Sequence, residues 1–396
     1  MAKHADKYGV TATEVGFDYG RMQVRKQKIV RKLMLGIKSR LQGAEMVTGS
    51  ASVVSRTDEV VTLQCNGVQY EARNLLVCTG SSNVVPPIPG IEGNEHVWSS
   101  KEALEAKQLP ESVVIVGGGV IGLEFATLFN GLGVEVTVIE FLPQILPALD
   151  DDIVAMLRAD YEKRGVHFMT STKVEAIEGD KVIWSDKNST GGGFVKAEKI
   201  LVCVGRRPNT DGLEALTDLQ YEGRGIKVNE FMQTNLKNVY AAGDVTGKIM
   251  LAHVASRQAE VAVGRITKTI PVQRIAYNAI PSVVYTWPET ASVGLTEKDL
   301  RGKDSVLPMD VEVKKLPMTF SGRFVAENEG ETGLCKVIVD KRSQTILGVH
   351  LYGNPASEII GAASAAVRFG YTLPEWQQVI FPHPTVSEIL KEALLA

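Results

Sequence analysis

The stretch from Ser112 to Glu140 constrains the fold of this chain more than any other part of it. An apolar run over 112–116 is followed at once by a loop with the pattern G-x-G-x-x-G, formed by Gly117, Gly118, Gly119, Val120, Ile121 and Gly122. A second apolar run, 134–140, ends in the acidic residue Glu140. Strand, glycine turn, helix and strand in this order predict a βαβ unit that binds a dinucleotide.

The three spaced glycines have separate roles. Gly117 permits the tight turn, Gly119 lets the backbone approach a pyrophosphate, and Gly122 lets the helix pack closely on the strand. The phosphates would lie at the helix N-terminus, where free N–H groups favour anions. Glu140 would accept a hydrogen bond from a ribose 2′-OH, and no Lys or Arg occurs in 141–149 to bind a 2′-phosphate. A charge-assisted hydrogen bond contributes on the order of 1.5–3 kcal/mol, so we expect roughly ten- to a hundredfold preference for NAD over NADP.

The composition carries no electrostatic bias. The 396 residues are 44% hydrophobic and 22% charged, with a formal net charge of −3. This balance gives no attraction to nucleic acid or to an anionic membrane. No uncharged apolar stretch reaches the roughly 18 residues that a membrane span needs. The N-terminal residues lack the apolar core of a signal peptide, so we expect a cytoplasmic protein.

The four cysteines are Cys65, Cys78, Cys203 and Cys335. No two of them have the close spacing of a metal or redox motif, so no metal site is expected. We expect them to behave as small buried hydrophobic residues.

Strand and helix patterns divide the chain into units of different organisation. Residues 1–100 contain a basic helix at 21–42, strands at 51–54, 59–65 and 68–81, and a proline-rich linker at 84–90. Residues 101–224 alternate strands at 112–116, 134–140, 166–169, 173–178, 181–184 and 194–204 with helices at 120–132 and 150–164. This alternation predicts a doubly wound parallel sheet. Residues 225–272 hold a third strand–turn–helix. Residues 273–396 have an α+β pattern, with a strand at 280–286, a hairpin at 333–352 and helices at 355–369 and 386–395.

Two further sites carry candidate chemistry, and each has a purely structural alternative. Asp244 follows a short strand and could hold a polyol hydroxyl, or it could simply belong to an Asp-Val-Thr-Gly turn. His383 lies between two prolines, and Glu388 follows five residues later. Glu388 also completes a capping box with Thr385, while His383 could be an ordinary surface imidazole. Glu124, in the helix after the glycine turn, could be functional or an ordinary helical glutamate.

Together these motifs resemble the pyridine nucleotide–disulfide oxidoreductases, and among them the dihydrolipoamide dehydrogenases. The resemblance is carried by 117–140, 202–209, Ala242-Gly243-Asp244 and His383-Pro384-Thr385, and it covers essentially the whole chain. It implies an α/β protein with two Rossmann-like FAD/NAD(P)-binding domains, the first incomplete, and a C-terminal α+β dimerisation domain. The segments become a partial FAD domain (1–100), an NAD domain (101–224), a resumed FAD domain (225–272) and an interface domain (273–396).

The resemblance also implies site roles. Glu124, Val174 and Gly205 would join the glycine turn and Glu140 in the NAD site. The implied FAD site contains Gly49, Thr79, Gly80, Ser81, Asp244, Met250, Leu251, Ala252 and His253. His383 would be the general base toward a dihydrolipoyl thiol, oriented by Glu388, because an imidazole can accept a proton near neutral pH. The implied partners are a second copy of the chain and the lipoyl domain of a 2-oxoacid dehydrogenase complex or of the glycine cleavage system.

The chain departs from the family in two respects. The family uses a Cys-x-x-x-x-Cys pair beside the flavin, and no two cysteines here have that spacing. Within 75–81 and 200–206, apolar runs stop at Gly80 and Gly205, yet only the second run is preceded by a dinucleotide loop. We therefore expect a truncated N-terminus and a chain that is inactive as written. The alternatives are a non-catalytic remnant that binds NAD and dimerises, or a flavoprotein like glutathione reductase, mercuric reductase or soluble transhydrogenase.

Overall fold

A five-stranded parallel sheet forms the centre of the nucleotide-binding region in the computed structural model. The structure describes residues 5–6, 8–11, 14–269, 274–301 and 307–395. The sheet order is β6-β13-β7-β8-β9. Its strands are β6 (Val97–Trp98), β13 (Lys199–Val202), β7 (Ser112–Val116), β8 (Glu135–Ile139) and β9 (His167–Met169). The flanking helices are α2 (Ser100–Glu105), α3 (Val120–Gly131) and α4 (Asp151–Lys163). The predicted doubly wound sheet is thus confirmed.

The sequence explains why β7 lies at the centre of this sheet. Residues 113–116 of β7 are all buried, as expected for a strand covered on both faces. Helix α3 begins at Val120 with Gly119 as its N-cap and buries Leu123, Ala126 and Phe129. These side chains recur at helical spacing and pack against β7 and β8 in one hydrophobic cluster.

A small antiparallel sheet adjoins the parallel one. It consists of β10 (Thr172–Glu178), β11 (Lys181–Asp186) and β12 (Gly192–Lys196). The single strand predicted over 194–204 is wrong, because β12 and β13 are separate strands in different sheets. The break between them falls at residues 197–198, where no glycine or proline marks it. A pattern of apolar residues alone does not reveal a change of sheet.

A two-stranded parallel pair joins the N-terminal region to a segment far along the chain. This pair is β4 (Leu75–Val77) and β17 (Val239–Ala241). A separate antiparallel sheet contains β1 (Ala51–Arg56), β2 (Val61–Cys65) and β3 (Val68–Ala72). The predicted strand 68–81 is therefore three strands, since β5 (Ser81–Asn83) pairs with β14 (Arg206–Pro208) instead. Further elements are β15 (Tyr221–Glu222), β16 (Gly225–Ile226), η2 (Asp244–Thr246) and α5 (Ala252–Thr267).

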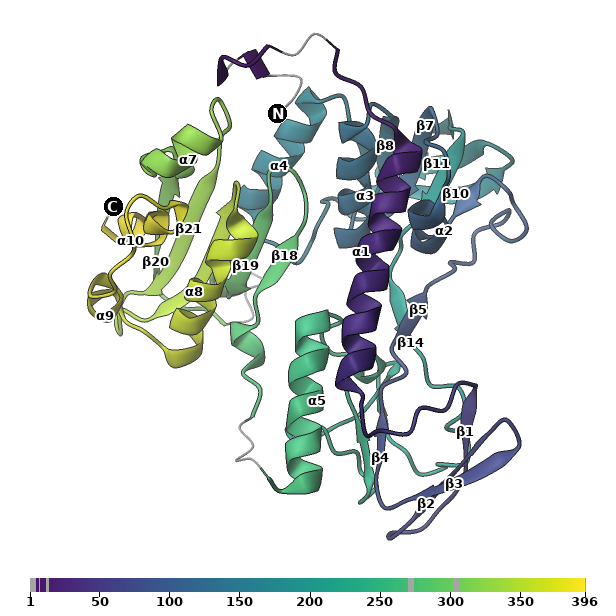
Figure 1. The fold of residues 1–396 in the computed structure, drawn as a ribbon. Helices are drawn as coiled ribbons and strands as arrows, with labels where there is room; N and C mark the ends of the chain where they lie inside the picture. Colours follow the sequence, from purple (N-terminus) through teal and green to yellow (C-terminus); the bar gives the residue numbers. More distant parts are fainter. Residues whose placement is uncertain (1–4, 7, 12–13, 270–273, 302–306, 396) are drawn as a thin grey trace.

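The predicted basic helix forms as α1 (Tyr19–Arg40), capped by the Asp18 side chain. None of its residues is buried, and Figure 1 shows it as a long helix crossing the front of the molecule. Lys26 of α1 donates a hydrogen bond to the Leu104 carbonyl of α2.

The C-terminal region is built on a five-stranded antiparallel sheet. Its order is β18-β19-β22-β21-β20. The strands are β18 (Ser282–Val284), β19 (Thr290–Gly294), β20 (Val311–Pro317), β21 (Leu334–Asp340) and β22 (Ile346–Tyr352). The predicted hairpin is confirmed as β21 and β22, whereas β19 and β20 were not predicted. Figure 1 shows this sheet on the opposite side of the molecule from β1–β3.

Helices cover the C-terminal sheet. They and the short helical turns of this region are η3 (Tyr277–Ala279), α6 (Glu297–Leu300), η4 (Met318–Phe320), α7 (Gly322–Glu327), α8 (Ala356–Phe369), α9 (Leu373–Gln377), η5 (Val386–Glu388) and α10 (Ile389–Leu395). The predicted terminal helix is divided into η5 and α10. The expected domain boundary at 272/273 lies outside the described residues. Among the described residues, no helix combines the length and apolar character of a membrane span.

Candidate functional site

The glycine turn after β7 has a geometry that side chains would block. Gly117 has φ +110°, and a Cβ there would lie 2.5 Å from the carbonyl oxygen of Cys203. A Cβ on Gly122 would lie 2.1 Å from the carbonyl oxygen of Gly117. The turn therefore brings the first residues of α3 against the backbone of β7. This close approach is what a dinucleotide-binding turn requires.

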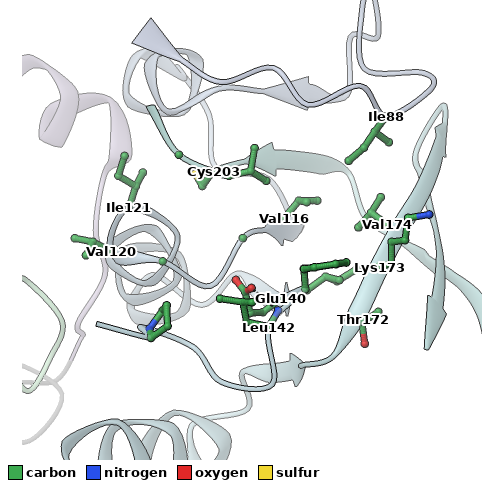
Figure 2. Close-up of a pocket in the computed structure, with 17 residues that line it drawn as sticks. Ile88, Val116, Val120, Ile121, Glu140, Leu142, Thr172, Lys173, Val174 and Cys203 are labelled. Carbon is green, nitrogen blue, oxygen red and sulfur yellow. Dashed lines mark hydrogen bonds between the residues drawn. The ribbon is translucent and has the colours of Figure 1, made fainter. Parts of the chain in front are cut away.

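A cavity of about 600 Å³ opens beside this turn. Figure 2 shows side chains from the turn, the end of β8, the segment after it, and β10 around this space. Its lining includes the predicted NAD-site residues Gly117, Gly119, Val120, Ile121, Glu140, Val174 and Gly205. The structure thus brings these seven residues together. Six of them follow the carboxyl ends of the parallel strands β7, β8 and β13, where open α/β sheets bind ligands, and Val174 comes from the antiparallel strand β10.

Glu140 is fixed on the wall of the cavity by its own surroundings. Its Oε2 accepts a hydrogen bond from the Gly118 N–H at 2.6 Å, and its Oε1 accepts one from the Leu142 N–H at 2.7 Å. The residue is only 8% exposed. Each carboxylate oxygen can accept further hydrogen bonds, so a ribose hydroxyl can still bind. Gly118 contributes to the site through this bond.

Two cations near the cavity were missed by sequence reasoning. Lys173 of β10 lines the cavity and pairs with Glu175 at 2.7 Å. The Nζ of Lys187 lies 3.5 Å from the ring centroid of Phe141 and donates to the Phe141 carbonyl at 3.2 Å. The segment 141–149 itself contains no cation, but both lysines reach its neighbourhood from the adjacent antiparallel sheet. Because both lysines lie far from Glu140 in the sequence, the residues around Glu140 do not reveal them.

Glu124 contacts the C-terminal region rather than the cavity. Its Oε1 accepts a hydrogen bond from the Tyr285 N–H at 3.1 Å, which links α3 to that region. It is not among the residues that line the described cavity. Burial raises the pKa of the Glu124 carboxyl, and the Tyr285 bond partly opposes this.

Four of the nine predicted FAD residues, Thr79, Gly80, Ser81 and Asp244, follow the ends of β4 and β17. Ser81 Oγ donates to Asp244 Oδ2 at 2.5 Å, and Asp244 opens η2 directly after β17. The Gly80 carbonyl accepts from the Asn209 N–H at 2.9 Å, and Thr79 Oγ1 donates to the Asn209 carbonyl at 2.5 Å. A carboxylate and hydroxyls at the carboxyl ends of two parallel strands fit the polyol and phosphates of a dinucleotide.

The other five FAD candidates are Gly49 and the residues 250–253 at the start of α5. Met250 and Leu251 are partly buried and lead into α5, which begins at Ala252. His253, in the first turn of α5, shares a hydrogen bond with the Pro281 carbonyl through Nε2 at 2.9 Å. Gly49 packs beside the turn between β2 and β3, where a Cβ would lie 2.6 Å from the side chains of Cys65 and Asn66.

His383 and Glu388 form the expected pair. The His383 Nδ1 lies 2.9 Å from Glu388 Oε1, and the imidazole is 82% exposed. Glu388 Oε2 accepts a hydrogen bond from the Thr385 N–H at 2.8 Å, so the capping box forms as well. The Thr385 N–H and the contact with His383 lower the pKa of Glu388. One carboxylate therefore makes both of the contacts that the sequence allowed.

The four thiols form no disulfide with one another. All four cysteines are free. Burial raises the pKa of Cys203 and of Cys335 to about 12 in each case. A thiol is nucleophilic only as its thiolate, so burial disfavours the reactive form of both. Cys78 is exposed, but partial burial of its thiol still raises the pKa.

Comparison with known proteins places this geometry in a family. Residues 3–259 match the model of the pyridine nucleotide-disulphide oxidoreductases, and residues 280–394 match the dimerisation domain of that family. The chain is 34% identical to a dihydrolipoyl dehydrogenase of Bacillus subtilis over 100% of its length and 85% of that protein's. It is 35% identical to the dihydrolipoyl dehydrogenase of Thermus scotoductus, covering 99% of the chain and 84% of the relative.

Solved structures agree with these sequence matches. LpdA from Mycobacterium tuberculosis is 25% identical, with a TM-score of 0.87 over 99% of this chain and 85% of that one. A mutant of the flavoprotein disulfide reductase RclA from Escherichia coli, solved as a Cu(II) complex, is 26% identical, with a TM-score of 0.83 over 96% of this chain and 86% of that one. Dihydrolipoyl dehydrogenases use FAD and NAD, the two groups that the predicted sites fit. The chain belongs to the pyridine nucleotide-disulphide oxidoreductase family, as the resemblance predicted.

Proposed function

We propose that this chain carries the NAD-binding, FAD-binding and interface parts of a dihydrolipoyl dehydrogenase. The observation that carries the proposal is the Glu140 carboxylate on the wall of a cavity that also exposes the glycine turn. The glycine turn would bind the pyrophosphate through backbone N–H groups at the start of α3. Glu140 would accept a hydrogen bond from the ribose hydroxyl. Val174, from β10, and Gly205, which follows β13, also line the cavity.

The flavin would be held by residues at the ends of β4 and β17. Asp244, which already accepts a hydrogen bond from Ser81, would also accept hydrogen bonds from hydroxyl groups of the ribityl chain. Thr79 and Gly80 lie beside the pyrophosphate in this assignment, and the first turn of α5 with Met250 to His253 flanks the ring. When bound, FAD supplies two-electron transfer between a thiol pair and a nicotinamide.

His383 would act as the general base. Dihydrolipoamide loses two electrons and two protons when its thiols form a disulfide, and NAD takes up a hydride. His383 Nε2 would accept a thiol proton, while the Nδ1 contact with Glu388 fixes the ring and stabilises the imidazolium. The exposure of the ring leaves Nε2 accessible to a substrate from outside its own subunit.

The proposed assembly is a homodimer that receives its substrate from a lipoyl domain. The match of residues 280–394 to a dimerisation domain supports the dimer. The names of the relatives support a lipoyl substrate, carried by a 2-oxoacid dehydrogenase complex or by the glycine cleavage system.

The 396 residues by themselves contain no cysteine pair at the family spacing. We therefore propose that this chain, expressed as it stands, binds NADH and does not oxidise dihydrolipoamide. The alternative is a non-catalytic NAD-binding dimer, which the absence of that cysteine pair favours.

Two measurements on the purified chain test the proposal. NADH fluorescence titration should show saturable binding, and a failure of the unaltered chain to bind would contradict the NAD site. Dihydrolipoamide-dependent formation of NADH should be absent, and turnover would contradict the proposed inactivity. Flavin absorbance after incubation with FAD distinguishes the two proposals. Bound flavin is expected for the dihydrolipoyl dehydrogenase and is not expected for the NAD-binding dimer.

A further inference from the structure

The segment 141–150 connects the nucleotide cavity to the C-terminal sheet. Phe141, Leu142 and Pro147 from this segment line the cavity. The Leu146 N–H donates to the Gly118 carbonyl at 2.9 Å, inside the glycine turn itself. A displacement of this segment would therefore change both the wall of the cavity and the turn.

Two lysines from the C-terminal region hold the other end of the segment. Lys298 of α6 donates through Nζ to the carbonyls of Pro147 at 2.6 Å and Leu149 at 2.9 Å. Lys336 of β21 bonds both carboxylate oxygens of Asp150 at 2.8 Å. Pro147 thus lines the cavity while its carbonyl is bonded to α6.

The Lys336 contact is buried and multiply bonded. Its side chain is 2% exposed and that of Asp150 is 1% exposed. Lys336 Nζ also contacts Asp152 at 2.5 Å and Glu297 at 2.8 Å. Burial lowers the pKa of Lys336, but its hydrogen bonds to the three carboxylates outweigh this and raise the pKa. The lysine therefore stays charged, and the geometry of the contact is fixed.

We propose that Lys298 and Lys336 are positioning residues for the nucleotide cavity. Nucleotide binding is thereby coupled to the contact between the C-terminal region and the segment 141–150. This inference rests on the proposed NAD site. Lys298 is the sharper probe, because it bonds backbone carbonyls and is 37% exposed, so its removal leaves no buried charge. Coupling is reciprocal, so bound NADH must also tighten the contact at α6.

The test compares NADH affinity in four purified chains. They are the unaltered protein, Lys298→Met, Lys298→Arg and the control Lys341→Met, whose exposed lysine pairs with Asp310. We expect Lys298→Met to weaken NADH binding roughly five- to tenfold. Lys298→Arg, which can still donate to two carbonyls, should restore most of the affinity, and Lys341→Met should bind like the unaltered chain.

Amide hydrogen exchange on the unaltered protein gives a second reading that needs no substitution. NADH should slow exchange in both 141–150 and 295–301. Equal NADH affinity in Lys298→Met and the unaltered chain would overturn the inference and leave the NAD site intact. Protection confined to the cavity residues would overturn it as well. If the unaltered chain binds no NADH, both the NAD site and the inference fail.

Discussion

Removal of the Lys336 ammonium should destabilise the protein strongly. In Lys336→Met, the carboxylate of Asp150 would remain at 1% exposure without its cation. Breaking a buried ion pair by removing one partner costs about 3–5 kcal/mol in free energy of unfolding. Asp152 and Glu297 are 38% and 30% exposed, so water can replace much of what they lose. We therefore assign most of the expected cost to Asp150.

Urea unfolding followed by tryptophan fluorescence and circular dichroism would measure this cost. The control Lys341→Met removes an exposed pair and should change the free energy of unfolding by only about 0–1 kcal/mol. The double variant Lys336→Met with Asp150→Asn should recover much of the loss, because it removes the unpaired charge and an Asn can still cap α4. A loss below about 1 kcal/mol in Lys336→Met would refute the reasoning, as would a double variant no more stable than the single one.

Three other predictions concern pH, the turn and cofactor choice. Burial lowers the pKa of His350, so the unfolded chain binds a proton more readily than the folded one. The free energy of unfolding should therefore fall as pH drops below about 6.5, and His350→Leu should flatten the urea midpoints between pH 7 and pH 5; an equal slope in both proteins would contradict this. In Gly122→Ala the new Cβ would lie 2.1 Å from a backbone oxygen, so NADH titration should show binding abolished, whereas Gly131→Ala, with open space around it, should bind normally. Glu140→Ala should reduce the preference for NADH over NADPH by roughly tenfold or more in the same titration, and an unchanged ratio would show that Glu140 does not discriminate.

The parts that could be predicted from sequence are those whose determinants are contiguous. Strand β7 was predicted at its observed bounds, and α3 and β8 within about one residue, because apolar runs, a glycine turn and an acid follow one another directly. The pairing of His383 with Glu388 was also within reach, since only five residues separate them.

The parts that could not be predicted depend on contacts between distant segments. Lys173 lines the cavity and Lys187 contacts Phe141 only because the β10–β12 sheet folds beside β8. Lys336 pairs with a residue 186 positions earlier, and nothing in its local sequence distinguishes it from a surface lysine of a strand. The contact of Glu124 with Tyr285 also joins residues that are distant in the sequence, so the sequence around Glu124 does not reveal it. Strands β19 and β20 were not predicted, because they are defined by pairing with strands distant in the sequence.

The shared use of Glu388 has a thermal consequence. Its two oxygens connect the first turn of the last helical segment to the imidazole of His383, so neither contact can be lost without disturbing the other. Helix ends fray at lower temperatures than the sheets beneath them melt. Warming should therefore release the His383 ring while the surrounding region is still folded, so the fixed orientation of the proposed base would be lost before global unfolding begins.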